Sequence, residues 1–306
     1  MSTLGKIVSA LTGGAGGGAQ ARLRDMLPHG LIARLPARTL DRPVFMVGLP
    51  RSGTTIVSRL LGNHRQLAHW SEAPMVWDRN WRSLDNDHRW PAADVSPERI
   101  RRVNNNFAWY ASVKRKGRIL NKHPRNSLRI PFLAAGWPDC LIINVERDPR
   151  AVVNSLVERT QAEAWRRDKP LGQFARPVDW REIDACPDVV EKFTRMTLSI
   201  HQTLSADLRT CIPSRRLLEI RYEDFAADVR GALTRMSDFC GLTADPACLA
   251  KAPEKLENRN FKWAQKRSQA EVQTMARLLG PLLIDAKYEK DDSWVEKALS
   301  QAQPKA

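Results

Sequence analysis

Long apolar runs are missing from this chain of 306 residues. No segment approaches the roughly 20 consecutive apolar residues of a membrane-spanning helix, so we do not expect an integral membrane protein. Hydrophobic residues make up 42% of the chain and charged residues 27%. This balance is typical of a folded globular protein and excludes a disordered chain.

Cysteine is scarce as well, with five residues and no CxxC pair. A CxxC zinc site and a disulfide-based scaffold are therefore both disfavoured in a chain of this length. The apolar run after Lys6 is shorter than the roughly 7–15 apolar residues of a secretory signal. We expect reduced thiols, no metal ion and a cytoplasmic protein.

Acidic residues are outnumbered, because 34 Asp and Glu stand against 49 Lys and Arg, a net charge of +15. Such an excess predicts an anionic partner. Nucleic acid, an anionic lipid surface and a phosphorylated small molecule all fit, and composition does not choose among them.

Strands alternate with helices along much of the sequence. Apolar runs bounded by turn residues predict buried strands at residues 43–48, 140–145 and 216–221. Each is followed by a predicted helix, at 54–61, at 151–159 and ending near 239. Asp148 is the expected N-cap of the second helix, with Pro149 at its first position. The order is typical of an α/β, P-loop-like parallel sheet with helices on both faces.

The domain organisation follows from these elements. Residues 1–42 are expected to form a glycine-rich tail and a helix, and residues 43–306 a single domain. Within it, 75–130 is expected to be an insert, 187–211 an amphipathic helix, and 241–306 a C-terminal helical segment.

The strongest local signal is the loop Gly48-Leu-Pro-Arg-Ser-Gly53-Thr54-Thr55, between a predicted strand and a predicted helix. In that position backbone N–H groups and a helix N-terminus bind phosphate. The spacing is that of a Walker A loop, but Thr54 stands where that motif has Lys. Because a kinase uses this Lys together with Mg²⁺, the loop predicts a phosphate site and disfavours ATP.

The segment PRSGTT after a buried strand resembles the 5′-phosphosulfate loop of sulfotransferases that use 3′-phosphoadenosine 5′-phosphosulfate (PAPS). It is most similar to the branch that contains protein-tyrosine sulfotransferases and bacterial carbohydrate or lipid sulfotransferases. The resemblance covers about residues 43–265. It implies donor-binding roles for Arg51, Ser52, Gly53, Thr54 and Thr55.

A second anion site is implied by Arg147, just past the second predicted strand, and Ser155, in the next helix. In the resembled family an Arg and a Ser at this spacing bind the 3′-phosphate of PAPS. A guanidinium and a hydroxyl beside a helix N-terminus suit a phosphate. Arg159, one turn further, is either a third ligand or a surface partner of Glu163.

Two outlying residues complete the expected nucleotide site. Tyr222, in Arg-Tyr-Glu-Asp-Phe, resembles the family's aromatic residue near the adenine, although it could equally close a strand end. Lys262 lies in a basic and aromatic C-terminal segment of the kind that closes the nucleotide pocket in the family.

Sulfonyl transfer to a hydroxyl needs a base, cations for the developing charge and in-line positioning. The resemblance gives the role of base to Glu72 and the charge-stabilising role to Lys122, in Asn-Lys122-His-Pro, and Arg51 could share that charge. His64 and His69 are rival bases, and Glu72 on position alone is an exposed residue at a helix start. Lys122 also belongs to a basic run of the kind that forms solvated faces or nucleic-acid patches.

The resemblance implies a PAPS-dependent sulfotransferase that acts on a carbohydrate or glycolipid hydroxyl without a metal ion. The resemblance places the insert 75–130 on the acceptor side, and its tryptophan-rich region 75–111 is expected to set acceptor choice. Two alternatives stay open, a kinase-like phosphotransferase in which Arg51 replaces the Lys and a basic protein that binds RNA or a membrane surface. Nucleic acid is the partner we expect least, peripheral contact with the inner face of a membrane fits the charge, and the oligomeric state is not predicted.

Overall fold

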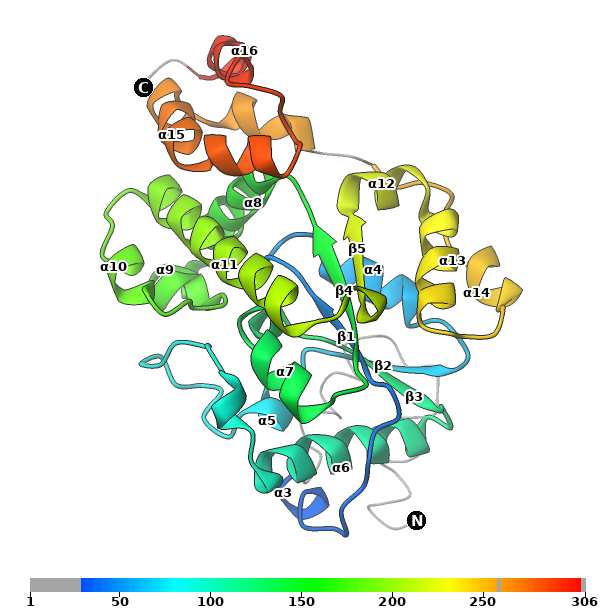
Figure 1. Ribbon diagram of the computed structural model, residues 1–306. Coiled ribbons are helices and arrows are strands. Elements are labelled where there is room, and N and C mark those ends of the chain that lie inside the picture. The colour runs from blue at the N-terminus through cyan, green and yellow to red at the C-terminus, as the bar shows by residue number, and fades with distance from the viewer. Residues whose placement is uncertain (1–28, 258–259, 304–306) are drawn as a thin grey trace.

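The computed structural model describes residues 29–257 and 260–303, with the backbone alone described for Phe261 and Lys262. Its centre is a sheet of five parallel strands in the order β2-β3-β1-β4-β5 (Figure 1). The strands are β1 (Val44–Val47), β2 (Leu67–Ser71), β3 (Arg118–Lys122), β4 (Leu141–Glu146) and β5 (Leu217–Arg221). The predicted α/β fold is confirmed.

Strand β1 occupies the middle of the sheet, and Val44 pairs with Leu120 of β3 and with Leu141 of β4. All four of its side chains are buried. Because side chains alternate along a strand, Val44 and Met46 join one core cluster while Phe45 and Val47 join another. The sheet is therefore covered on both faces, as an all-parallel sheet requires.

Two groups of helices provide this cover. On the face of Val44 and Met46 lie α4 (Thr54–Leu61), α12 (Tyr222–Ala227) and α13 (Val229–Phe239), with α14 (Pro246–Ala250) beside them. On the face of Phe45 lie α5 (Pro74–Trp77), α6 (Pro97–Val113), α7 (Ile130–Gly136) and the end of α11 (Val189–Cys211).

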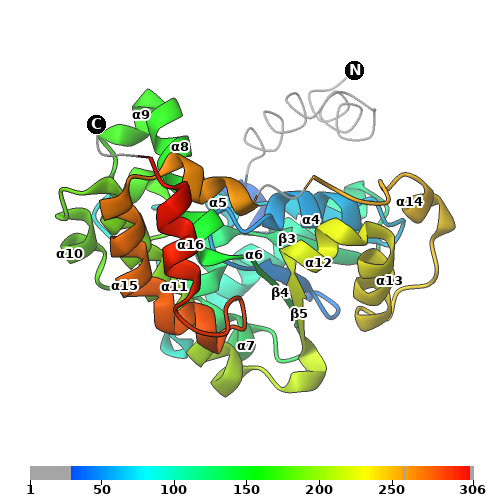
Figure 2. The same cartoon turned by 90° about the horizontal axis from the view of Figure 1, so that it is seen from above.

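A further core cluster joins α8 (Pro149–Ala162) and α11 to α15 (Gln269–Asp285) and α16 (Trp294–Gln301). Figures 1 and 2 place α15 and α16 on the opposite side of the molecule from α13 and α14. Asp148 caps α8 by accepting from the Arg150 N–H, and Pro149 is its first residue, as predicted.

Short elements connect these layers. They are α3 (His29–Ile32), η1 (Ala92–Asp94), η2 (Pro124–Leu128), α9 (Ala164–Arg167), η3 (Pro170–Gln173), α10 (Trp180–Asp184), η4 (Ser214–Arg216) and η5 (Asn260–Lys266). In the described part of the predicted N-terminal helix, only α3 is helical. Within the described ranges, no helix has both the length and the apolar character to cross a membrane.

Strands β2 and β3 and helix α6 are not predicted from the sequence. The reason is their composition, since polar residues such as Asn121 and Lys122 are fully buried within β3 and break its apolar pattern. Because β3 pairs with both β1 and β2, the segment 75–130 supplies a strand of the sheet. Its role on the acceptor side stays a prediction.

Candidate active site

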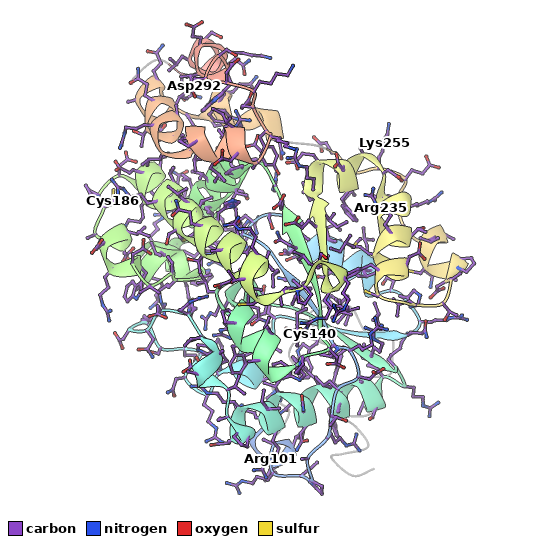
Figure 3. All side chains as sticks on the ribbon, in the orientation of Figure 1. Arg101, Cys140, Cys186, Arg235, Lys255 and Asp292 are labelled. Carbon is purple, nitrogen blue, oxygen red and sulfur yellow. The ribbon has the colours of Figure 1, made fainter. Side chains whose placement is uncertain are left out.

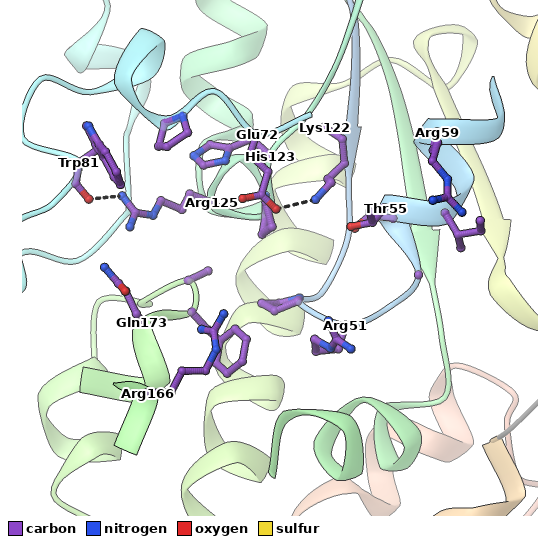
Figure 4. Close-up of a pocket in the computed structure, with 18 of the residues that line it drawn as sticks. Arg51, Thr55, Arg59, Glu72, Trp81, Lys122, His123, Arg125, Arg166 and Gln173 are labelled. Atoms are coloured by element: carbon purple, nitrogen blue, oxygen red, sulfur yellow. Dashed lines mark hydrogen bonds and ion pairs between the residues drawn. The ribbon is translucent and has the colours of Figure 1, made fainter. Parts of the chain in front are cut away.

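A cavity of about 500 Å³ opens at the carboxyl edge of the sheet. The segments that follow β1, β2, β3 and β4 each contribute to its lining, through Arg51, Glu72, His123 and Arg147 respectively. Parallel strands end at the same edge, and ligands of open α/β sheets bind in the crevice outside these ends. The cavity is therefore the candidate active site (Figure 4).

The loop after β1 has a backbone that only glycine permits at two positions. Gly48 has φ 148° and Gly53 has φ 93°. A Cβ atom at Gly48 would lie 2.4 Å from the Val145 carbonyl oxygen, and one at Gly53 would lie 2.3 Å from the Tyr222 ring. The Ser127 hydroxyl donates to the Gly48 carbonyl oxygen over 2.8 Å, which ties the loop to η2. Helix α4 begins directly after the loop, as predicted.

The two predicted anion sites are joined by hydrogen bonds. Arg147 Nη1 donates to the Arg51 carbonyl oxygen over 3.0 Å, and Arg51 Nε donates to Ser155 Oγ over 3.1 Å. The Arg147 guanidinium also lies 4.8 Å from the centroid of the Tyr222 ring. The structure thus brings together four residues that the sequence separates by as many as 171 positions (222 − 51).

This end of the cavity is strongly cationic. The pKa of Arg51 is lowered, first by partial burial and then by Arg159, Arg147 and Arg166. Such mutual repulsion disfavours the charged form of Arg51. A bound anion would remove the repulsion, so the arrangement suits a phosphate or a sulfonate.

Three further residues were predicted to bind the nucleotide, and the structure places each of them differently. Arg159 forms an ion pair with Glu163, the alternative considered from the sequence, and Glu163 also binds Arg166. Tyr222 begins α12, and its ring lies against Gly53. The side chain of Lys262 lies outside the described residues. The donor-binding roles of all three stay predictions.

Glu72 and Lys122 meet at the ends of β2 and β3. Lys122 Nζ donates to Glu72 Oε1 over 2.8 Å, and the two side chains are 2% and 52% exposed. Glu72 and Ala73 both have left-handed backbones, with φ 68° and φ 58°. This tight turn sends the Glu72 carboxylate back over the sheet edge, so the predicted base and the predicted charge stabiliser share one site.

Asn121 holds this turn in place and was not identified from the sequence as a functional residue. Its amide nitrogen donates to the Trp70 carbonyl oxygen over 2.7 Å and to that of Glu72 over 3.3 Å. Its amide oxygen accepts from Trp77 Nε1 over 3.1 Å. The sequence contained a signal for Asn121, because this residue precedes Lys122 in the Asn-Lys-x-Pro element. Its role depends on burial of the side-chain amide between neighbouring segments, which the sequence of one strand does not reveal.

The rival bases are placed elsewhere. The His64 ring bonds the Thr243 carbonyl oxygen over 2.9 Å and accepts from the Gln66 N–H over 3.1 Å. His69 packs against Gly62, the residue that follows α4. Neither histidine lines the cavity.

The rest of the cavity wall includes residues that were not among the predicted site residues. They are Trp81, Arg125, Trp165, Arg166, Gln173 and Phe174, of which Trp81 belongs to the tryptophan-rich region expected to set acceptor choice. Of the tryptophans in 75–111, Trp77 and Trp90 are buried in the core, while Trp81 reaches the cavity. Among the described residues, no group of three or more His, Cys, Asp or Glu side chains could hold a metal ion.

Comparison with known proteins gives a family profile, described as the sulfotransferase family, that matches residues 43–246. A Caenorhabditis briggsae protein, named provisionally as a protein-tyrosine sulfotransferase, is 26% identical over 125 residues, 39% of this chain and 44% of that protein. Protein-tyrosine sulfotransferase A of Caenorhabditis elegans is 27% identical over 125 residues, 38% of this chain and 33% of that protein. The matches thus span less than half the length of either relative.

A solved structure agrees on the fold. Sulfotransferase STF9 from Mycobacterium avium superposes with a TM-score of 0.50 at 18% identity, and the match covers 91% of this chain and 88% of that one. At this identity the likeness concerns the fold alone.

Proposed function

This chain belongs to the sulfotransferase family, and we propose that it transfers a sulfonate group from PAPS to an acceptor hydroxyl. One observation carries the proposal: the loop residue Arg51 is hydrogen-bonded to both Arg147 and Ser155. A donor with a 5′-phosphosulfate and a 3′-phosphate needs two anion sites held at a fixed separation, and a connection of this kind supports the proposal because it would hold the two proposed sites together.

In the proposed complex, the loop 49–55 and the start of α4 bind the 5′-phosphosulfate. Arg147 and Ser155 bind the 3′-phosphate, and the half-buried Tyr222 ring lies near the adenine. The absence of a Lys at Thr54 supports this donor over ATP, because a kinase places that Lys on the transferred phosphoryl group.

The proposed reaction is a direct in-line transfer. The Glu72 carboxylate removes the proton of the acceptor hydroxyl, and the hydroxyl oxygen forms a bond to sulfur. The bond between sulfur and the bridging oxygen breaks, and its electron pair leaves on adenosine 3′,5′-bisphosphate. Lys122, whose ammonium has three donors, and Arg51 stabilise that developing negative charge.

The acceptor we propose is a carbohydrate or glycolipid hydroxyl. Trp81 lines the cavity and Trp165, 51% exposed, stands at its edge, where flat aromatic faces offer contact area to a sugar ring. We also propose a cytoplasmic location, which fits the three buried thiols, and peripheral contact with anionic lipid, which fits the net charge of +15.

Calorimetric titration with adenosine 3′,5′-bisphosphate, repeated with ATP, each with and without Mg²⁺, tests the proposal. We expect binding of the bisphosphate that is independent of metal and weakened in Arg147→Ala. Arg209→Ala, an exposed site on α11, is the matched control. Binding of Mg·ATP alone would replace the proposal with the kinase-like alternative.

A further inference from the structure

Three buried arginines lie in and around the acceptor end of the cavity without a carboxylate partner. Arg125, Arg129 and Arg176 are 9%, 0% and 1% exposed. None of the three forms an ion pair with a described carboxylate. From beyond ion-pair distance, Asp78 attracts Arg125 and Arg129, Glu72 attracts Arg125, and Asp94 attracts Arg129. Asp85, Asp87 and Asp184 attract Arg176 in the same way. By contrast, the buried Arg150 pairs with both Asp148 and Glu289.

Neutral groups satisfy these arginines only in part. Arg125 Nη1 donates to the Trp81 carbonyl oxygen over 3.0 Å, and Arg176 Nε donates to that of Asn86 over 2.7 Å. The Arg129 guanidinium carbon lies 3.6 Å from the centroid of the Trp90 ring, and its two terminal nitrogens have no hydrogen-bond partner among the described residues. Carbonyl dipoles, a ring face and carboxylates beyond ion-pair distance offset these three buried charges only in part.

The two histidines beside these arginines add no negative charge. His88 and His123 are buried, and their pKa values are lowered, first by burial and then by the neighbouring arginines. Both ring nitrogens of His123 and the whole side-chain amide of Asn126 lack a hydrogen-bond partner in the described part of the chain. The cluster therefore has hydrogen-bond donors without a described partner, and no described carboxylate is in contact with its arginines.

Arg125 connects this cluster to the cavity. It lines the wall together with Trp81 and Glu72, and Figure 4 shows it between those two residues, across the cavity from Arg51. A group bound at Arg125 would thus lie on the other side of Glu72 from the proposed donor site. The anions of the donor are already assigned to Arg51 and Arg147, so an anion at Arg125 has to come from another molecule.

We propose that Arg125, with Arg129 and Arg176 behind it, binds an anionic oxygen group of the acceptor. The acceptor is then a hydroxyl compound that carries a carboxylate, sulfate or phosphate within reach of the hydroxyl. A guanidinium binds such groups through two parallel hydrogen bonds. This inference rests on the proposed function, because it names the class of acceptor used by the same site.

Two matched pairs of probes test the inference. The first pair is 4-nitrophenyl β-D-glucuronide and 4-nitrophenyl β-D-glucoside, which differ by a carboxylate in place of a hydroxymethyl group. The second is 3-(4-hydroxyphenyl)propionate and 3-(4-hydroxyphenyl)propanol. For each probe, affinity is measured by calorimetry on protein saturated with adenosine 3′,5′-bisphosphate, and turnover is measured with PAPS as release of the bisphosphate.

We expect the carboxylate member of at least one pair to be favoured by about tenfold or more in affinity. Arg125→Gln should abolish this preference, and Arg125→Lys should restore part of it, because the charge returns without the guanidinium fork. Arg101→Gln removes the same charge from the exposed surface of α6, where Figure 3 labels Arg101. Arg101 does not line the cavity, so this variant should leave the preference intact.

Three results would overturn the inference. They are equal affinity within both pairs, no measurable binding of either carboxylate at millimolar concentration, and a preference that survives in Arg125→Gln while thermal melting shows the variant to be folded. Failure of the bisphosphate to bind would instead refute the proposed function. The two failures are therefore distinguishable within one set of titrations.

Discussion

The two ends of the cavity are both rich in arginine but are built in different ways. At the donor end, Arg51 and Arg147 belong to loops that directly follow neighbouring strands, and they bond each other. At the acceptor end, Arg125 and Arg176 come from separate segments and are held by carbonyl oxygens of the loop between Trp81 and Trp90. Local motifs thus make the donor end, while tertiary packing makes the acceptor end.

This difference predicts that the two ends can be perturbed separately. Changes at the donor end should alter affinity for the bisphosphate, because the anion contacts are made there. Changes beyond Glu72 should alter turnover or acceptor choice and leave that affinity unchanged.

The largest effect is expected from Glu72→Gln, at the junction of the two ends. Loss of the general base should lower kcat by about 10²–10⁴-fold, because the amide cannot accept the hydroxyl proton. Affinity for the bisphosphate should stay at the wild-type level in the same titration. Glu296→Gln, on the exposed surface of α16, is the control for loss of a carboxylate, and near-wild-type turnover in Glu72→Gln would remove Glu72 from the mechanism.

Arg147→Ala should have the next largest effect, on binding. Hydrogen bonds to charged groups contribute about 1.5–3 kcal/mol, so we expect the Kd for the bisphosphate to rise about 10–100-fold. The affinity of the carboxylate probes should not change, since Arg147 lies at the donor end. Weaker binding of both kinds of ligand would mean that the two ends act as one site.

The sequence predicted the donor end better than the acceptor end, because local motifs form the donor end and tertiary packing forms the acceptor end. Strands β1, β4 and β5 are apolar runs followed by turn residues, so each strand and the loop after it could be recognised locally. Strand β3 was missed because Asn121 and Lys122, which serve the site, are polar residues in a buried strand. The meeting of Arg125 with Arg176 depends on chain packing over 51 positions (176 − 125), which no local pattern encodes.

Acid pH should lower the stability of the folded chain in part through the buried histidines of the acceptor end. His88 and His123 are buried with lowered pKa values, and Arg125 and Arg129 face both. Below the ordinary histidine pKa of 6.5, the unfolded chain binds protons that the folded chain does not, so stability falls as pH falls. The slope is about 1.4 kcal/mol per pH unit for each histidine.

Denaturant unfolding between the ordinary histidine pKa and more acidic pH measures this slope. His88→Gln should reduce it, because the amide oxygen can replace the ring nitrogen that accepts from the Arg176 N–H and does not titrate. A stability that does not change over this range would show that both rings take up protons in the folded state.

The smallest effect has the opposite sign. Arg129→Met removes a buried charge that has no carboxylate partner, and replacing such charges with apolar groups is often stabilising. A gain of about 1 kcal/mol would raise Tm by roughly 2–4 °C in a domain of this size class. Arg150→Met, which leaves Asp148 and Glu289 without their partner, should lower Tm and serves as the matched contrast.

The same comparison of the wild-type protein with Arg129→Met at alkaline pH separates the effect of the Arg129 charge from the effect of packing. Burial lowers the pKa of Arg129 to about 9, against 12.5 for the free side chain. Between these values the unfolded chain holds a proton that the folded chain has released, so the wild-type protein gains stability as pH rises. The Met variant lacks this gain, and its advantage should shrink above about pH 9. An advantage that does not depend on pH would show that the Arg129 pKa is not lowered in the folded chain, and the gain in stability would then come from packing rather than from removal of a buried charge.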